Sequence, residues 1–95
     1  KVGGIVLKNV HDGQRMKLET KAVFPYIGAD PCTEFAQDLG ILDERGYILV
    51  NNNMETARAG IYGVGDVTAK TLRQVVTAAN DGAIAAQQAF HQIKQ

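Results

Sequence analysis

The sequence predicts an α/β fold, because short apolar runs bounded by glycines precede one long amphipathic helix. Residues 22–27, 47–50 and 61–64 are apolar runs of strand length, and turn residues separate them. From residue 72 onward apolar side chains recur every three or four positions, as one face of a helix requires. We therefore expect strands 22–27 and 61–64 to share a sheet, with the helix 72–93 packed on it.

Residues 1–21 predict a β-hairpin. Residues 4–7 are an apolar run, residues 15–21 alternate polar and apolar side chains, and the segment between them carries Asn and an Asp-Gly pair. We expect this hairpin to belong to a neighbouring domain, separate from residues 22–95. His11 lies at its tip and has no second metal ligand at a suitable spacing, so we interpret it as a solvated loop residue.

The middle of the chain predicts a loop and a short helix. Pro25 removes a backbone donor, which places the strand around it at the edge of a sheet. Thr33 is a candidate N-cap for a helix over residues 34–39 that ends at Gly40. Cys32 lies in the loop before this helix without a neighbouring histidine or second cysteine, so we interpret it as structural rather than redox-active.

Composition limits the partners of this chain. Its 95 residues are 45% hydrophobic and 21% charged, which is typical of one small globular domain. The net charge of zero argues against a nucleic-acid partner, and no apolar run approaches the roughly 18 residues that a membrane span needs. A single cysteine favours a reduced, cytoplasmic setting. Because the chain opens on Lys1 within a predicted strand, we expect it to be part of a longer polypeptide.

The motif Gly63-Val64-Gly65-Asp66-Val67-Thr68 is the first candidate binding element. It begins like the dinucleotide-binding G-x-G-x-x-G, but Thr68 replaces the third glycine and Asp66 adds negative charge where a pyrophosphate needs amide donors. A carboxylate at the end of a strand is instead an acceptor for hydroxyl groups, such as those of a ribityl or ribose chain. Gly65 lets the backbone approach such a ligand. The alternative interpretation is that Asp66 is a turn residue or a helix cap.

The helix start is the second candidate element. Thr71 and Gln74 fit a capping box, so the free amides and positive end of the helix should lie near Asp66. Such an end stabilises negative charge on a bound group, as on a reduced flavin ring. Arg73 and Gln74 can add side-chain hydrogen bonds to the same ring; otherwise Arg73 is a solvated cation. Serine is absent and neither histidine has triad or metal spacing, so we expect no catalytic or metal-binding residue in this chain.

Residues 60–67 and 72–86 closely resemble the C-terminal part of low-molecular-weight thioredoxin reductases, which are FAD- and NADPH-dependent pyridine nucleotide-disulfide oxidoreductases. Residues 24–33 are similar to that family's F-x-x-I-G-x-x-P-N-T segment, with Cys32 in place of Asn. Residues 2–7 resemble the closing hairpin of its NADPH-binding domain. The resemblance therefore covers essentially the whole chain.

The resemblance implies the C-terminal part of an FAD/NAD(P)-binding domain of the ββα-sandwich type. It assigns residues 1–21 to the NADPH-binding domain and residues 22–95 to the FAD-binding domain. It implies a cytoplasmic, homodimeric parent enzyme that passes NADPH electrons through FAD to the disulfide of a thioredoxin-like protein. In that family the residue matching Asp66 holds a ribityl hydroxyl, and three more residues lie against the isoalloxazine ring: those matching Arg73, Gln74 and Val75.

Three motifs of the family are missing from this chain: the glycine-rich FAD motif, the NADPH glycine motif and the C-x-x-C pair. We therefore expect the chain alone to be inactive, and to self-associate because it exposes apolar surface. One alternative is the flavoprotein of a peroxide reductase, or a ferredoxin–NADP reductase of the same architecture. Another is a non-catalytic binding or assembly module that kept the shape and lost the chemistry.

Overall fold

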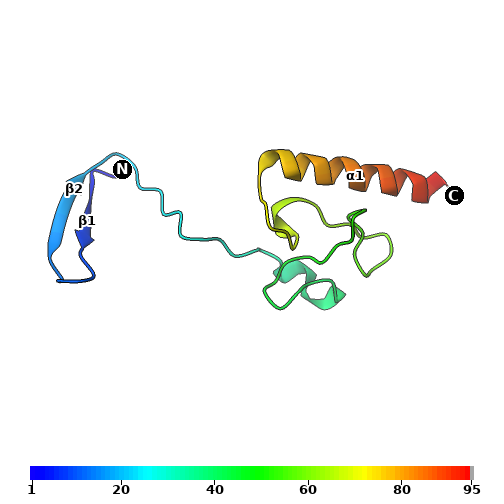
Figure 1. Ribbon diagram of the computed structural model, residues 1–95, viewed down its shortest axis with the longest axis horizontal. Coiled ribbons are helices and arrows are strands. Elements are labelled where there is room, and N and C mark those ends of the chain that lie inside the picture. The colour runs from blue at the N-terminus through cyan, green and yellow to red at the C-terminus, as the bar shows by residue number, and fades with distance from the viewer. Residues whose placement is uncertain (95) are drawn as a thin grey trace.

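The computed structural model describes residues 1–94, which form a β-hairpin, an extended segment and a small C-terminal body (Figure 1). The principal extents are 65 × 25 × 24 Å and the radius of gyration is 19.9 Å. A compact domain of this length has a radius of gyration of about 12 Å. The chain is therefore elongated, with its hairpin at one end and its long helix at the other.

The hairpin confirms the prediction for the first part of the chain. Strand β1 (Gly4–Lys8) pairs antiparallel with β2 (Arg15–Glu19). Gly13 closes the turn with a φ of 74°, and its N–H donates to the carbonyl of Asn9 at 2.8 Å. Among residues 1–94 the hairpin contacts no other helix or strand, so it has no core to pack on within this chain.

The expected strand 22–27 is wrong. This segment runs extended between the hairpin and the C-terminal body, without pairing to any strand in the described chain. Tyr26 is 90% exposed and Ile27 is 95% exposed. An extended segment becomes a strand only when a neighbouring backbone supplies hydrogen-bond partners, and residues 1–94 supply none here.

The C-terminal body opens with the 3₁₀ helix η1 (Glu34–Leu39), which covers the residues predicted to be helical. Gly40 ends it with a φ of 68°, in the left-handed region that favours glycine. Thr33 is the N-cap residue of this helix, as predicted, but its side chain makes no capping hydrogen bond to it. Its Oγ1 instead donates to the carbonyl oxygen of Gly46 at 2.6 Å, so the hydroxyl ties together two loops.

A small apolar cluster around Ile48 is the core of this body. Ile48 is paired by isolated β-bridges with Leu42 on one side and Thr68 on the other. The expected strand 47–50 is therefore reduced to bridges, and the expected strand 61–64 pairs only at Tyr62. Buried Ala36, Ile41 and Ile48 pack against further apolar side chains that are partly buried: Leu39, Leu42, Val50, Ile61 and Val67.

Gly63 is required by close packing against this core. A Cβ at this position would lie 2.7 Å from Cγ2 of Ile48 and 2.9 Å from Cγ1 of Val50. We expect Gly63→Ala to lower the free energy of unfolding by roughly 1–3 kcal/mol, because a buried β-branched side chain must move. Gly82→Ala is the matched control, since nothing lies within 4 Å of the place its methyl group would take and alanine favours the helix by about 1 kcal/mol. Urea unfolding that ranks the two variants equally would contradict this assignment.

The helix α1 (Val75–Lys94) lies along the C-terminal body (Figure 1) and, with the hairpin, confirms the α/β class. Its expected packing face is wrong. Asp81 and Ala85 are the buried residues, whereas Val75 is 87% exposed and Ile93 is 85% exposed. The helix therefore packs through a narrow face of small and polar side chains. Its apolar stripe points away from the body and includes Val75, Val76, Phe90 and Ile93. Self-association through this stripe stays a prediction.

Candidate functional site

The 3₁₀ turn η2 (Gly65–Val67) presents Asp66 to solvent. Gly65 is buried and has a φ of 79°, a conformation that residues with a side chain rarely adopt. Its carbonyl accepts the N–H of Thr68 at 3.1 Å and the Thr68 hydroxyl at 2.7 Å. These hydrogen bonds hold the backbone of the turn in place, so the exposed Asp66 side chain projects from a fixed position.

Arg73 holds the same turn from outside. Its Nε donates to the carbonyl of Asp66 at 2.9 Å, and its Nη2 donates to the carbonyl of Thr68 at 3.0 Å. The guanidinium carbon lies 4.2 Å from the ring centroid of Tyr47, which adds a cation–π contact. Arg73 is therefore half-buried and anchored to the backbone, a role that the sequence did not predict for it.

The helix starts later than the capping box predicted. Helix α1 begins at Val75 rather than after Thr71, and Gln74 precedes its first turn. The N–H of Gln74 donates to Oγ1 of Thr77 at 3.0 Å, and that hydroxyl donates back to the carbonyl of Gln74 at 2.9 Å. Before the helix, the Arg73 side chain instead binds the segment to η2 through its two hydrogen bonds to the carbonyls of Asp66 and Thr68.

The first-turn amides remain available to a ligand. The first helical backbone bond runs from the N–H of Ala78 to the carbonyl of Gln74 at 3.0 Å. The N–H groups of Val75 and Val76 therefore have no acceptor within the helix. They give this end of α1 a positive electrostatic potential.

Two hollows meet at Asp66 and Arg73. The first, of about 320 Å³, brings together most of the predicted site residues and is lined by Asp66, Arg73, Gln74, Val75 and Ala78. Gly65 lies beneath it, and a Cβ at Gly65 would lie 3.5 Å from the Cβ of Ala78. The second, of about 410 Å³, extends from the same two residues to the loop before η1 and is lined by Ala29, Asp30, Pro31, Cys32, Tyr47, Asp66, Val67 and Arg73.

Sequence reasoning missed Tyr47 and the loop 29–32 as neighbours of Asp66, because only the fold of the chain brings them together. Cys32 is exposed and is a free thiol on the rim of the second hollow. No cluster of three or more histidine, cysteine, aspartate or glutamate side chains that could hold a metal occurs within residues 1–94.

An ion pair between a buried carboxylate and a partly buried lysine lies directly behind the site. Oδ2 of Asp81 accepts the N–H of Gly65 at 3.0 Å and forms an ion pair with Nζ of Lys70. The hydrogen bond from Lys70 outweighs burial and lowers the pKa of Asp81, with the N–H of Gly65 acting in the same direction. Neither Lys70 nor Asp81 was predicted as a site residue. The available signal was an aspartate in the middle of an alanine-rich helix, where a charge is unfavourable without a partner.

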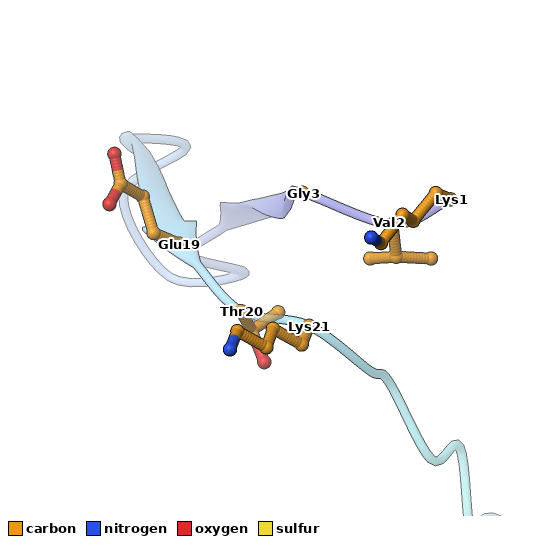
Figure 2. A pocket seen from close by; sticks show the side chains of 6 residues that line it. All are labelled: Lys1, Val2, Gly3, Glu19, Thr20 and Lys21. Atoms are coloured by element: carbon orange, nitrogen blue, oxygen red, sulfur yellow. The ribbon is translucent and has the colours of Figure 1, made fainter.

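A further hollow, of about 610 Å³, lies at the open end of the hairpin and is lined by Lys1, Val2, Gly3, Glu19, Thr20 and Lys21. Figure 2 shows that these side chains splay apart, with the Glu19 carboxylate on the far side from Lys1. Because no polar groups converge there, it is not a candidate binding site. No helix in the described part of the chain is long and apolar enough to cross a membrane.

Comparisons with known proteins find thioredoxin reductases that are similar to this chain in sequence and fold. Thioredoxin reductase of Bacillus subtilis is 43% identical over 95 residues, which is 100% of this chain and 30% of that protein. The structure of thioredoxin reductase from Streptococcus pyogenes matches with a TM-score of 0.79 at 39% identity, over 97% of this chain and 30% of that one. That from Lactococcus lactis matches with a TM-score of 0.74 at 45% identity, over 94% and 29%.

These matches confirm the resemblance to thioredoxin reductases that the motifs indicated, and the chain spans about 30% of the length of these relatives. The sequence model for pyridine nucleotide-disulphide oxidoreductases matches residues 2–82, which is most of the chain. The chain therefore belongs to the pyridine nucleotide-disulphide oxidoreductase family.

Proposed function

We propose that this chain forms part of the FAD site of a longer flavoenzyme that uses NADPH to reduce the disulfide of a thioredoxin-like protein. One observation carries the proposal: the Asp66 carboxylate and the first helical residue, Val75, line the same hollow. Similarity to thioredoxin reductases over the whole chain supports the reaction class.

The residues present fit FAD. Within residues 1–94 the Asp66 carboxylate makes no hydrogen bond, and it is exposed, so it can accept a hydroxyl of a ribityl chain. The free amides of Val75 and Val76, at the positive end of α1, suit an electron-rich ring edge. FAD, when bound, accepts a hydride from a nicotinamide and passes the electrons on.

Each predicted site residue has a role in this arrangement. Gly65 allows the turn that carries the Asp66 carboxylate. Arg73 binds the backbone of that turn and also lines the hollow. Gln74 and Val75 are exposed at the helix tip, where they can lie against the ring. Because Cys32 is the single cysteine of the chain, the disulfide that reacts with the flavin must come from elsewhere in the enzyme.

The arrangement of the chain supports the proposed domain division. The hairpin contacts no other described helix or strand, and the extended segment separates it from the body that carries Asp66. We assign residues 1–21 to the NADPH-binding domain and residues 22–95 to the FAD-binding domain. The apolar stripe of α1 is exposed in this chain, which favours its being covered by other parts of the complete, homodimeric protein. The single free thiol is consistent with a cytoplasmic setting.

The complete protein tests the proposal. After incubation with excess FAD and gel filtration it should be yellow, NADPH should bleach it without oxygen, and the bleached form should reduce an oxidised thioredoxin. Preference for a peroxiredoxin system or for ferredoxin as electron acceptor would identify one of the related reductases instead. A protein that stays colourless after saturation with FAD would refute the proposal and favour a non-catalytic module.

A further inference from the structure

The carboxylate behind the site, that of Asp81, contacts the turn that carries Asp66. Asp81 is 4% exposed, yet it lies within the helix α1, whose other buried residue is alanine. Its Oδ2 accepts the N–H of Gly65, the residue immediately before Asp66, at 3.0 Å. A buried charge is unfavourable unless it is paired, and Lys70 supplies the pair.

The N–H of Gly65 needs this acceptor. Gly65 follows an extended residue, Val64, and adopts a left-handed conformation, which turns its N–H toward the helix. Without Asp81 the buried N–H would have no partner, and the turn would lose the contact that fixes its inner side. Thr68 fixes the carbonyl of Gly65, and Arg73 fixes the carbonyl of Asp66.

These contacts determine the position from which the Asp66 side chain projects. Because its carboxylate has no hydrogen-bond partner within residues 1–94, the region that it can reach is set by the backbone of η2. Lys70 lowers the pKa of Asp81 and so favours the carboxylate, whose Oδ2 accepts the N–H of Gly65. Helix α1 therefore contributes to the site in two ways: its free amides lie at the hollow, and its Asp81 holds the turn that carries Asp66.

We propose that Asp81, held by Lys70, is a positioning residue for FAD that fixes the Gly65–Asp66 turn without touching the cofactor. This inference rests on the proposed function of the site. It predicts that a change at Asp81 alters both the affinity for FAD and the orientation of the bound flavin, beyond any loss of folding stability.

The test uses the complete flavoprotein and three variants. In Asp81→Leu the Gly65 N–H loses its acceptor, and we expect FAD to bind roughly tenfold more weakly, as for one lost hydrogen bond. Asp81→Asn keeps an acceptor oxygen but loses the charge, and we expect an intermediate loss of about threefold. Ala85→Gly is the matched control, because it weakens the same buried helix face without contacting Gly65.

The measurements are the dissociation constant of FAD, the visible circular dichroism of the bound flavin and the melting temperature. Ala85→Gly should lower the melting temperature but leave the FAD affinity within about twofold of the unmodified protein. The Asp81 variants should change the affinity and the flavin dichroism together. If Asp81→Leu does not fold, the FAD affinity and flavin dichroism of Asp81→Asn are compared with those of Ala85→Gly instead.

Two failures are distinguishable. If the unmodified protein binds FAD but the Asp81 variants change only the melting temperature, as Ala85→Gly does, the positioning role is wrong and the proposed function stands. If the unmodified protein does not bind FAD, the proposed function fails first, and the inference fails with it.

Discussion

Replacing Asp66 with alanine should weaken FAD binding by the complete protein roughly 10- to 100-fold, as expected for a lost hydrogen bond to a charged group worth about 1.5–3 kcal/mol. The structure gives the physical reason. Asp66 is exposed, its backbone carbonyl is bound by Arg73, and it lines the hollow at the start of α1. The flavin retained after gel filtration and the dissociation constant of FAD measure the effect.

The controls for this variant separate binding from folding. Because the Asp66 carboxylate makes no hydrogen bond within residues 1–94, its removal should change the free energy of unfolding by no more than about 0.5 kcal/mol. Asp38→Ala removes another exposed aspartate, in η1, away from both hollows, and should leave FAD binding unchanged. An Asp66→Ala protein that binds FAD as tightly as the unmodified protein would remove the main support for the site.

Replacing Lys70 with methionine should cost about 3 kcal/mol of folding stability at neutral pH. The substitution leaves the buried Asp81 carboxylate without its cation, and breaking a buried pair in this way typically costs about 3–5 kcal/mol. We take the lower end of this range because the Lys70 side chain is only partly buried. Lys94→Met, at an exposed position at the end of α1, is the control and should change stability little.

Acid pH should reduce the difference in folding stability between the unmodified protein and Lys70→Met. The pKa of Asp81 is lowered in the folded state, so its stabilising contribution is complete above the unfolded value of about 4 and is lost as pH falls through the folded value. The unmodified protein should therefore lose stability below about pH 4, and the gap to Lys70→Met should narrow there. Urea unfolding at neutral and at acid pH measures both effects. A gap that is independent of pH would show that the ion pair does not stabilise the fold.

The features that the sequence predicted correctly depend on neighbours in the chain. The hairpin follows from alternation of side chains and an Asp-Gly turn, and η1 ends at Gly40 as glycine chemistry predicts. The Gly65–Asp66 turn and the helix after it are also close in sequence, and the structure brings Asp66 and the start of α1 to one hollow. That this hollow binds a cofactor stays a prediction.

The features that the sequence did not predict depend on distant partners. The segment 22–27 has strand composition but lacks a neighbouring backbone in this chain. The start of α1 is shifted by hydrogen bonds from Arg73 to η2, which compete with the expected cap at Thr71. The role of Asp81 was not predicted, because its partners Lys70 and Gly65 lie 11 and 16 positions away.

The outward-facing apolar stripe of α1 has a consequence for mutational scanning. In a scan of these 95 residues alone, polar substitutions at Val75, Val76 and Ile93 would score as neutral, because these side chains already contact water. In the intact flavoenzyme the same substitutions would be harmful if that face is covered. Tolerance maps from the segment and from the whole protein should therefore disagree most along this one side of the helix.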